Sequence, residues 1–155
     1  MSFLSNRLTG LALVAWLLFF PNAPYILTDL LHLKSRAPIP YWYDLMLLLS
    51  FAWTGLMLGY LSLYEVQRFI AQRSQPWLAR LAVGMALPLC AIGVYIGRYR
   101  RWNSWDVLTR PGELLSDSIQ TLLPPHVEIG TVGMILVFTI FLFLGYQMMA
   151  IMIKE

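Results

Sequence analysis

Charged residues are scarce in this sequence, because Asp, Glu, Lys and Arg together make up only 12% of its 155 residues. Soluble domains carry about 25%. In contrast, 59% of the residues are apolar, which leaves too few charges to cover a water-facing surface. The composition therefore excludes an ordinary soluble domain and indicates an integral membrane protein, which we interpret as a single domain over residues 1–155.

Cysteine and histidine are also scarce. The chain has one cysteine, Cys90, so it cannot form an intramolecular disulfide, and its two histidines do not match the spacing of a known metal-binding motif. We therefore predict no metal site, and the sequence does not identify a cofactor. The net charge of +3 comes from arginines that flank apolar runs. The lipid bilayer and its anionic headgroups, rather than nucleic acid, are the expected partners.

Long apolar runs, by contrast, are abundant. A helix needs about 20 residues to cross a hydrocarbon core of roughly 30 Å. The four predicted spans are residues 8–20, extending toward 27, then 42–64, 81–97 and 129–153, with a connecting loop between the second and third. Leucine and isoleucine recur at helical spacing near residues 112–123, which predicts a helix lying at the membrane interface. The predicted fold class is all-α, a polytopic transmembrane helical bundle of about four spans.

Two prolines interrupt the end of the first apolar run. Pro21 and Pro24 lack a backbone N–H, so a helix that passes through them loses hydrogen bonds, and we predict a break there. A second short helix over Tyr25 to Leu33 is expected to follow, with Asn22 as its cap.

Polar residues on one side of the membrane form the candidate site. Two crossings separate the prolines from the long loop over residues 98–128, so both lie on the same side whichever way the chain is inserted. On the short helix, Asp29 and His32 are three residues apart and share a face. The candidate catalytic residues are His32, Asp29 and Asp44. The candidate anion-binding residues are Arg98, Arg100, Arg101, Asn22 and Trp105.

Two small-residue patterns indicate close helix packing. They are Gly55-x-x-x-Gly59 in the second span and Gly93-x-x-x-Gly97 in the third. Such pairs let another helix approach closely. Packing among the chain's own helices and a homo-oligomer through either pair both stay open.

Three motifs together resemble a known family. They are Phe20-Pro21-Asn22-Ala23-Pro24-Tyr25-x-x-Thr28-Asp29-x-x-His32-Leu33, Trp42-Tyr43-Asp44 and Gly97-Arg98-x-x-Arg101-Trp102-Asn103-Ser104-Trp105-Asp106. Over residues 10–150 the chain resembles the bacterial multi-pass membrane family called domain of unknown function 1361. The resemblance implies a polytopic helical protein of the bacterial inner (plasma) membrane and no particular activity, substrate or cofactor. Members generally have further hydrophobic spans before the proline motif, so either this member is short or N-terminal spans are missing.

The chemistry of these residue types favours an anionic ligand. Guanidinium groups bind phosphate and carboxylate with paired hydrogen bonds, and an imidazole beside a carboxylate can act as a general acid or base. We therefore predict a protein that binds or acts on an anionic lipid headgroup or small anion at one membrane face, and whether it is an enzyme stays open. One alternative is a non-catalytic structural or assembly subunit of a membrane complex. Another is an oligomeric small-solute transporter built on the broken helix.

Overall fold

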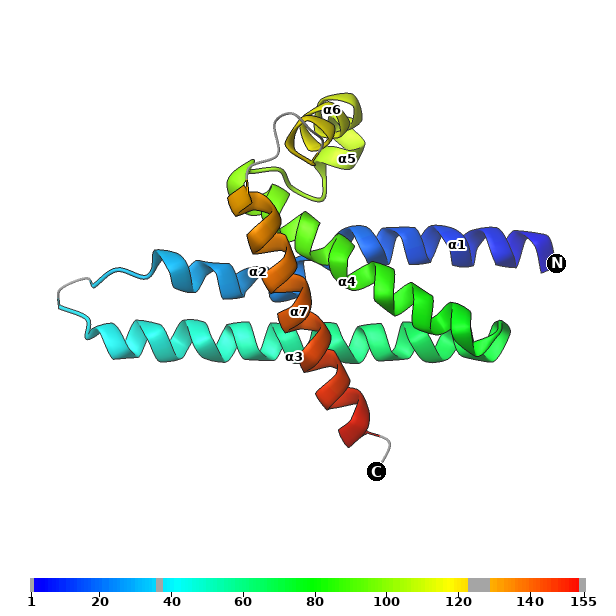
Figure 1. The fold of residues 1–155 in the computed structure, drawn as a ribbon, viewed down its shortest axis with the longest axis horizontal. Helices are drawn as coiled ribbons and strands as arrows, with labels where there is room; N and C mark the ends of the chain where they lie inside the picture. Colours follow the sequence, from blue (N-terminus) through cyan, green and yellow to red (C-terminus); the bar gives the residue numbers. More distant parts are fainter. Residues whose placement is uncertain (1, 36–37, 123–128, 154–155) are drawn as a thin grey trace.

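The computed structural model of the chain describes residues 2–35, 38–122 and 129–153. Its elements in chain order are α1 (Ser2–Phe19), α2 (Asn22–Tyr25), the 3₁₀ helix η1 (Ile26–His32), α3 (Tyr41–Arg73), α4 (Pro76–Tyr99), α5 (Asp106–Thr109), α6 (Pro111–Leu122) and α7 (Ile129–Met152) (Figure 1). These described ranges contain helices and no β-strand, which confirms the all-α class. The helix expected near residues 112–123 is present as α6, and its place at the membrane interface stays a prediction.

Among the described residues, four stretches are long and apolar enough to cross a membrane: Arg7–His32, Tyr41–Arg73, Pro76–Tyr99 and Ile129–Met152. They confirm the polytopic bundle of four spans. The first span differs from the expectation because it continues through the proline break as far as His32.

The expected loop between the second and third spans is almost entirely helical. Only Ser74 and Gln75 separate α3 from α4. Glutamate, glutamine and arginine are good helix formers, so the polar end of α3 continues the helix. The pair Glu65–Arg68, 3.2 Å apart, adds an i,i+3 contact, and Pro76 suits the first turn of α4.

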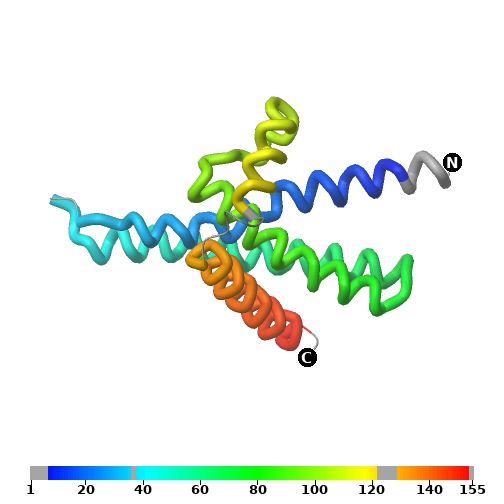
Figure 2. The backbone as a smooth tube through the Cα atoms, turned by 45° about the horizontal axis from the view of Figure 1, so that its top comes forward, coloured from blue at the N-terminus to red at the C-terminus, as the bar shows by residue number. Residues whose placement is uncertain are grey.

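The helices pack around α3 and α4. In Figure 1, α3 runs back along η1 and α2, and α4 returns obliquely toward the proline break. α7 packs across α4, while α5 and α6 form a small lobe beside the end of α4, which Figure 2 shows from a second direction. The most deeply buried large side chains come from α3, α4 and α7: Tyr60, Leu63, Leu87, Cys90, Val94, Leu142 and Tyr146.

Two pairs of polar side chains inside this bundle are joined by hydrogen bonds, whereas the buried hydroxyl of Tyr60 has no partner among the described residues. The indole N–H of Trp16 donates to Ser62 Oγ at 2.6 Å, and the hydroxyls of Tyr95 and Thr131 lie 2.8 Å apart. Within a hydrocarbon environment such groups are costly unless they find partners in the protein. These bonds therefore link α1 to α3 and α4 to α7 without exposing polar groups to lipid.

The glycine pair of α3 faces the proline break. A Cβ added at Gly55 would lie 2.7 Å from the carbonyl oxygen of Ala23, and one added at Gly59 would lie 2.9 Å from the Cβ of Ala23. Both distances are shorter than side chains tolerate. The absence of side chains on α3 therefore lets the broken helix approach its backbone.

The glycine pair of α4 faces the same break from the other side. A Cβ at Gly93 would lie 2.7 Å from Cγ of Pro21, and one at Gly97 would lie 3.3 Å from the ring of Tyr25. Both glycine pairs thus serve packing within the chain and hold the break between α3 and α4. A homo-oligomer contact through either pair stays a prediction.

Candidate functional site

The break in the first span is tied to the loop that follows α4. Pro21 and Pro24 prevent a continuous helix, and Ser104 Oγ donates to the carbonyl oxygen of Leu18, 3.0 Å away. The side-chain amide of Asn22 donates in turn to Ser104 Oγ at 3.4 Å. The prediction that Asn22 caps the following helix is wrong, because Asn22 is already its first residue and no side chain caps it.

The short helix after the break is mostly 3₁₀ rather than α-helical. Its seven residues, Ile26–His32, exceed the usual three or four of a 3₁₀ helix. With three residues per turn, side chains at positions i and i+3 lie directly in line. This geometry aligns Asp29 with His32 more closely than the α-helix that the sequence predicts.

Arg98, in the last turn of α4, reaches both of these side chains. Its Nη1 lies 2.7 Å from Asp29 Oδ1, and its Nη2 contacts His32 Nδ1. A guanidinium only donates hydrogen bonds, so His32 Nδ1 must accept and the imidazole must carry its proton on Nε2. The side chain of Arg98 is only 14% exposed, whereas that of Asp29 is 41% exposed. Arg98 also lies over the ring of Tyr25, with 5.9 Å between Cζ and the ring centroid.

Arg101 differs from Arg98 in both backbone and partners. Its φ of 59° places it in the left-handed region, just after the end of α4, where glycine is the usual residue. The side chain is exposed, and within the described part of the chain it makes no hydrogen bond or ion pair. Arg101 is therefore a strained residue whose charge is not neutralised by any residue that the structure describes.

These residues surround one open hollow of about 560 Å³. Its lining consists of Tyr25, Asp29, His32, Arg98, Arg101 and Asn103, together with Gly97. Asp29 neutralises Arg98, so the charge of Arg101 is in excess. Such a hollow suits an anion, because charge-assisted hydrogen bonds from a guanidinium are strong and directional. Within the described ranges, no three His, Cys, Asp or Glu side chains gather closely enough to hold a metal ion.

Arg100 and Trp105 lie outside this hollow. Arg100 points to α6, where its Nη2 lies 3.3 Å from Asp117 Oδ1 and its Nε donates to Thr121 Oγ1 at 2.9 Å. Trp105 is 64% exposed and packs edge-on against Phe19 at a centroid distance of 5.2 Å. The structure thus separates both residues from Arg98 and Arg101.

Asp44 also lies apart from the cluster. It is half-buried in the first turn of α3, and it does not line the hollow. Of the residues that the sequence singles out, the structure brings together Asp29, His32, Arg98 and Arg101. The catalytic and anion-binding roles predicted for all eight candidates stay predictions.

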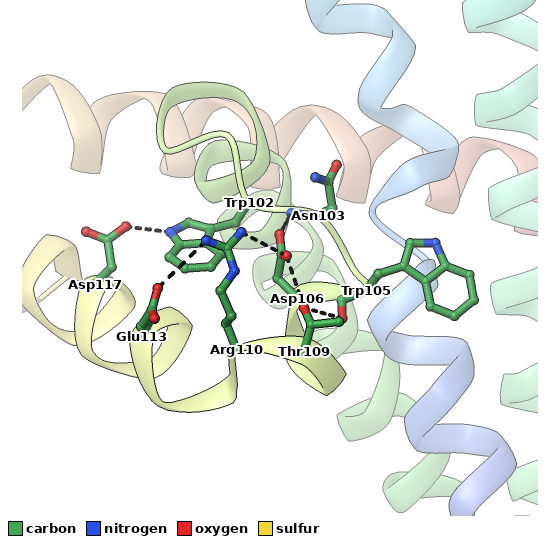
Figure 3. Close-up of polar contacts among 8 residues, drawn as sticks. All are labelled: Trp102, Asn103, Trp105, Asp106, Thr109, Arg110, Glu113 and Asp117. Carbon is green, nitrogen blue, oxygen red and sulfur yellow. Dashed lines mark hydrogen bonds and ion pairs between the residues drawn. The ribbon is translucent and has the colours of Figure 1, made fainter.

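A hydrogen-bond network fixes the loop that carries Arg101 and Asn103 (Figure 3). The indole N–H of Trp102 donates to Asp117 Oδ2, and the backbone N–H of Asn103 donates to Asp106 Oδ2, both at 2.7 Å. Arg110 Nη2 lies 3.3 Å from Asp106 Oδ1. The bond from the Asn103 backbone and then the contacts with Arg110 lower the pKa of Asp106. This network holds the loop against α6, so the position of Arg101 is set.

Sequence reasoning missed Tyr25 and Asn103, which complete the lining of the hollow. Both belong to the motifs that mark the chain, the first to the proline stretch and the second to the loop after α4. Asp106 follows Asn103 by three residues and begins α5. An aspartate at that spacing is a signal of an ordered turn, and this signal could have identified Asn103 as a candidate.

The fold and this arrangement define a polytopic helical membrane protein with a polar cluster at the break of its first span. The chain belongs to the family described as Protein of unknown function (DUF1361), whose model matches residues 2–145. The resemblance that the motifs carry is therefore confirmed. A comparison with curated proteins finds no match, and neither does one with solved structures.

Proposed function

We propose that the protein binds an anionic group, such as the phosphate of a lipid headgroup, in the hollow at the end of α4. The observation that carries this proposal is the exposed guanidinium of Arg101, which lacks a counter-charge among the described residues and lines the hollow. In this proposal the membrane is the inner (plasma) membrane of a bacterium.

The balance of charge favours an anion over a cation. Arg98 and Asp29 form a neutral pair, and the other lining groups are an imidazole, a phenol and an amide. One positive charge is therefore left over at Arg101. A phosphate would neutralise that charge and accept hydrogen bonds from its planar donors.

The backbone of Arg101 supports the same conclusion. A non-glycine residue in the left-handed region costs about 1–2 kcal/mol, and glycine would occupy this position after α4 without strain. An observed strain of this kind supports a functional role for the side chain, since stability alone would favour glycine.

Further donors line the hollow beside Arg101. Because His32 Nδ1 accepts from Arg98, its Nε2–H is left to donate. The side-chain amide of Asn103 makes no hydrogen bond within the part of the chain that the structure describes. An oxyanion beside Arg101 would therefore accept hydrogen bonds from one charged donor, the guanidinium of Arg101, and from two neutral donors, His32 Nε2–H and the amide of Asn103.

The structural-subunit alternative is favoured by a different observation, the contact of Arg98 with Asp29 and His32. This contact ties the end of α4 to the first span, as that alternative requires. We therefore assign the two arginines different roles. Arg98 holds the site together, and Arg101 is the residue that contacts the ligand.

Native mass spectrometry of the detergent-solubilised protein tests this proposal. The probes are dioleoyl phosphatidic acid and, as a neutral comparison, dioleoyl phosphatidylcholine. Loss of a hydrogen bond to a charged group costs about 1.5–3 kcal/mol, so Arg101→Gln should weaken phosphatidic acid binding at least about tenfold. The matched control is Arg80→Gln, which removes an exposed arginine near the opposite end of α4 and should leave binding unchanged. Equal binding by wild type and Arg101→Gln would overturn the proposal.

A further inference from the structure

A second cavity lies beside the hollow and has a different character. Its volume is about 370 Å³, and it lies between α1, α4 and the α5–α6 lobe. We call it the apolar slot, because hydrophobic side chains from all of these elements form most of its lining: Leu17, Leu18, Leu89, Ile96, Val107 and Leu114. Asn22, Asn103, Ser104 and Ser118 supply the polar part of the lining. Its size is within the range of roughly 300–1,000 Å³ that small-molecule sites occupy.

The slot follows one face of α4 toward the site. Leu89, Gly93, Ile96 and Gly97 line it at positions i, i+4, i+7 and i+8, which share a helix face. Eight residues at a rise of 1.5 Å give a length of about 12 Å. The slot therefore begins near the middle of a membrane span and ends at the turn that carries Arg98.

The slot and the hollow are neighbours. Tyr25, Gly97 and Asn103 line both of them, so the two cavities share a wall. At this shared wall Gly97 has no side chain, and a Cβ there would lie 3.3 Å from the ring of Tyr25 and 3.4 Å from the carbonyl oxygen of Trp102. A mainly apolar cavity thus adjoins a hollow in which the charge of Arg101 has no counter-charge among the described residues.

We propose that the apolar slot binds a hydrocarbon chain of a phospholipid whose phosphate lies against Arg101. This inference rests on the proposed function and narrows its ligand from an anion in general to a phosphorylated amphiphile. Two parts of such a phospholipid would complement the two cavities. Its hydrocarbon chain would contact the leucine and isoleucine side chains of the slot, and its phosphate would neutralise the guanidinium of Arg101. A free phosphate would leave the slot without an occupant.

The test compares a phosphate-containing probe that has hydrocarbon chains with one that has no hydrocarbon chain. Binding of dioleoyl phosphatidic acid is measured by native mass spectrometry, and binding of glycerol 3-phosphate by calorimetry, on the full chain in detergent. Leu114→Trp fills the slot from α6, whereas Leu115→Trp places the same side chain at a neighbouring position that is 62% exposed. A buried methylene contributes about 0.8 kcal/mol, so displacing even a few should weaken phosphatidic acid binding by Leu114→Trp about tenfold or more.

The expected pattern separates the two proposals. Leu114→Trp should weaken phosphatidic acid binding and leave glycerol 3-phosphate binding unchanged, Leu115→Trp should affect neither, and Arg101→Gln should weaken both. If Leu114→Trp binds phosphatidic acid as wild type does while Arg101→Gln does not, the slot inference is overturned and the anion site stands. If Arg101→Gln also binds normally, or wild type binds neither probe, both proposals fail.

Folding of the variants is checked by thermal unfolding and gel filtration. If Leu114→Trp does not fold, Val107→Phe fills the slot from α5 instead and carries the same expectation. Glycerol 3-phosphate binding as tight as that of phosphatidic acid would also overturn the slot inference, because the hydrocarbon chains of the lipid would then contribute nothing to the binding free energy.

Discussion

Arg98 and Asp29 are 69 positions apart in the sequence, and their side chains meet with 2.7 Å between Nη1 and Oδ1. The pair joins the last turn of α4 to the 3₁₀ segment of the first span. Because the arginine side chain is 14% exposed, its charge is largely removed from water and depends on the carboxylate for compensation.

Replacing the carboxylate should therefore destabilise the fold. Asp29→Asn leaves the mostly buried guanidinium without a counter-charge. Breaking a fully buried pair costs about 3–5 kcal/mol and breaking an exposed one up to about 1 kcal/mol. Since Asp29 is 41% exposed, we expect an intermediate loss of about 1–3 kcal/mol. The measurement is the free energy of unfolding in detergent micelles, followed by tryptophan fluorescence.

A double-mutant cycle isolates the contact itself. Arg98→Met alone removes the charge and keeps an apolar side chain of similar length, and the double variant removes both partners. The double variant should be more stable than the sum of the single effects by about 1–2 kcal/mol. Strict additivity would show that the pair contributes nothing to stability.

The side on which the site assembles could be predicted from the sequence, but the role of each arginine could not. The number of membrane crossings between the proline break and the loop after α4 predicts that both lie on the same side of the membrane. Arg98, at the end of α4, does reach Asp29 and His32. Arg98, Arg100 and Arg101 look alike in sequence. Their directions depend on where α4 ends and on the left-handed backbone of Arg101, which no hydrophobic pattern encodes.

The sequence also predicts which helix faces pack closely without predicting which segments pack against them. The glycine pairs predicted close approach, and it occurs, but a small-residue face does not specify what approaches it. The polar end of α3 was expected to be a loop because its charges end the apolar run. Charge ends the part of a helix that lies in lipid and has no effect on whether the helix itself continues.

Arg101→Gly should separate stability from binding. Glycine occupies the left-handed region without the strain of about 1–2 kcal/mol, although it also loses more backbone freedom on folding, by roughly 0.5–1 kcal/mol. We therefore expect thermal stability in detergent to be unchanged or to rise by up to about 1.5 kcal/mol, together with loss of phosphatidic acid binding. Arg101→Ala is the matched control, since it removes the same guanidinium but keeps the strain. A clear fall in stability for Arg101→Gly would show that the side chain holds the fold.

Gly93→Ala should destabilise the packing of the proline break. Its Cβ would lie 2.7 Å from Cγ of Pro21, whose rigid ring cannot turn aside. Overpacking of this kind costs about 1–3 kcal/mol, and the loss should appear as a lower midpoint in thermal unfolding. Gly84→Ala on the same helix meets nothing within 4 Å and should be neutral or stabilising. Equal effects of the two substitutions would contradict the packing of Pro21 against α4.

Asp106 should make the stability of the loop after α4 depend on pH. Its carboxylate accepts from the backbone of Asn103 and contacts Arg110, and these interactions lower its pKa in the folded protein. A lowered folded-state pKa means that the ionised form stabilises the fold. That contribution is fully present above the unfolded-state pKa of about 3.9 and is lost as the pH falls from there through the lower folded-state value.

Asp106→Asn tests this dependence directly, because the amide oxygen can still accept from Asn103 while the charge is removed. The variant should be less stable than wild type at pH 7, and the difference should stay constant down to about pH 5 and shrink below about pH 4, where the wild-type carboxylate becomes protonated. The measurement is the midpoint of thermal unfolding of both proteins at pH values from 7 to 3. A stability difference that persists unchanged to pH 3 would show that hydrogen-bond geometry, and not the charge of Asp106, holds Arg101 and Asn103 in place.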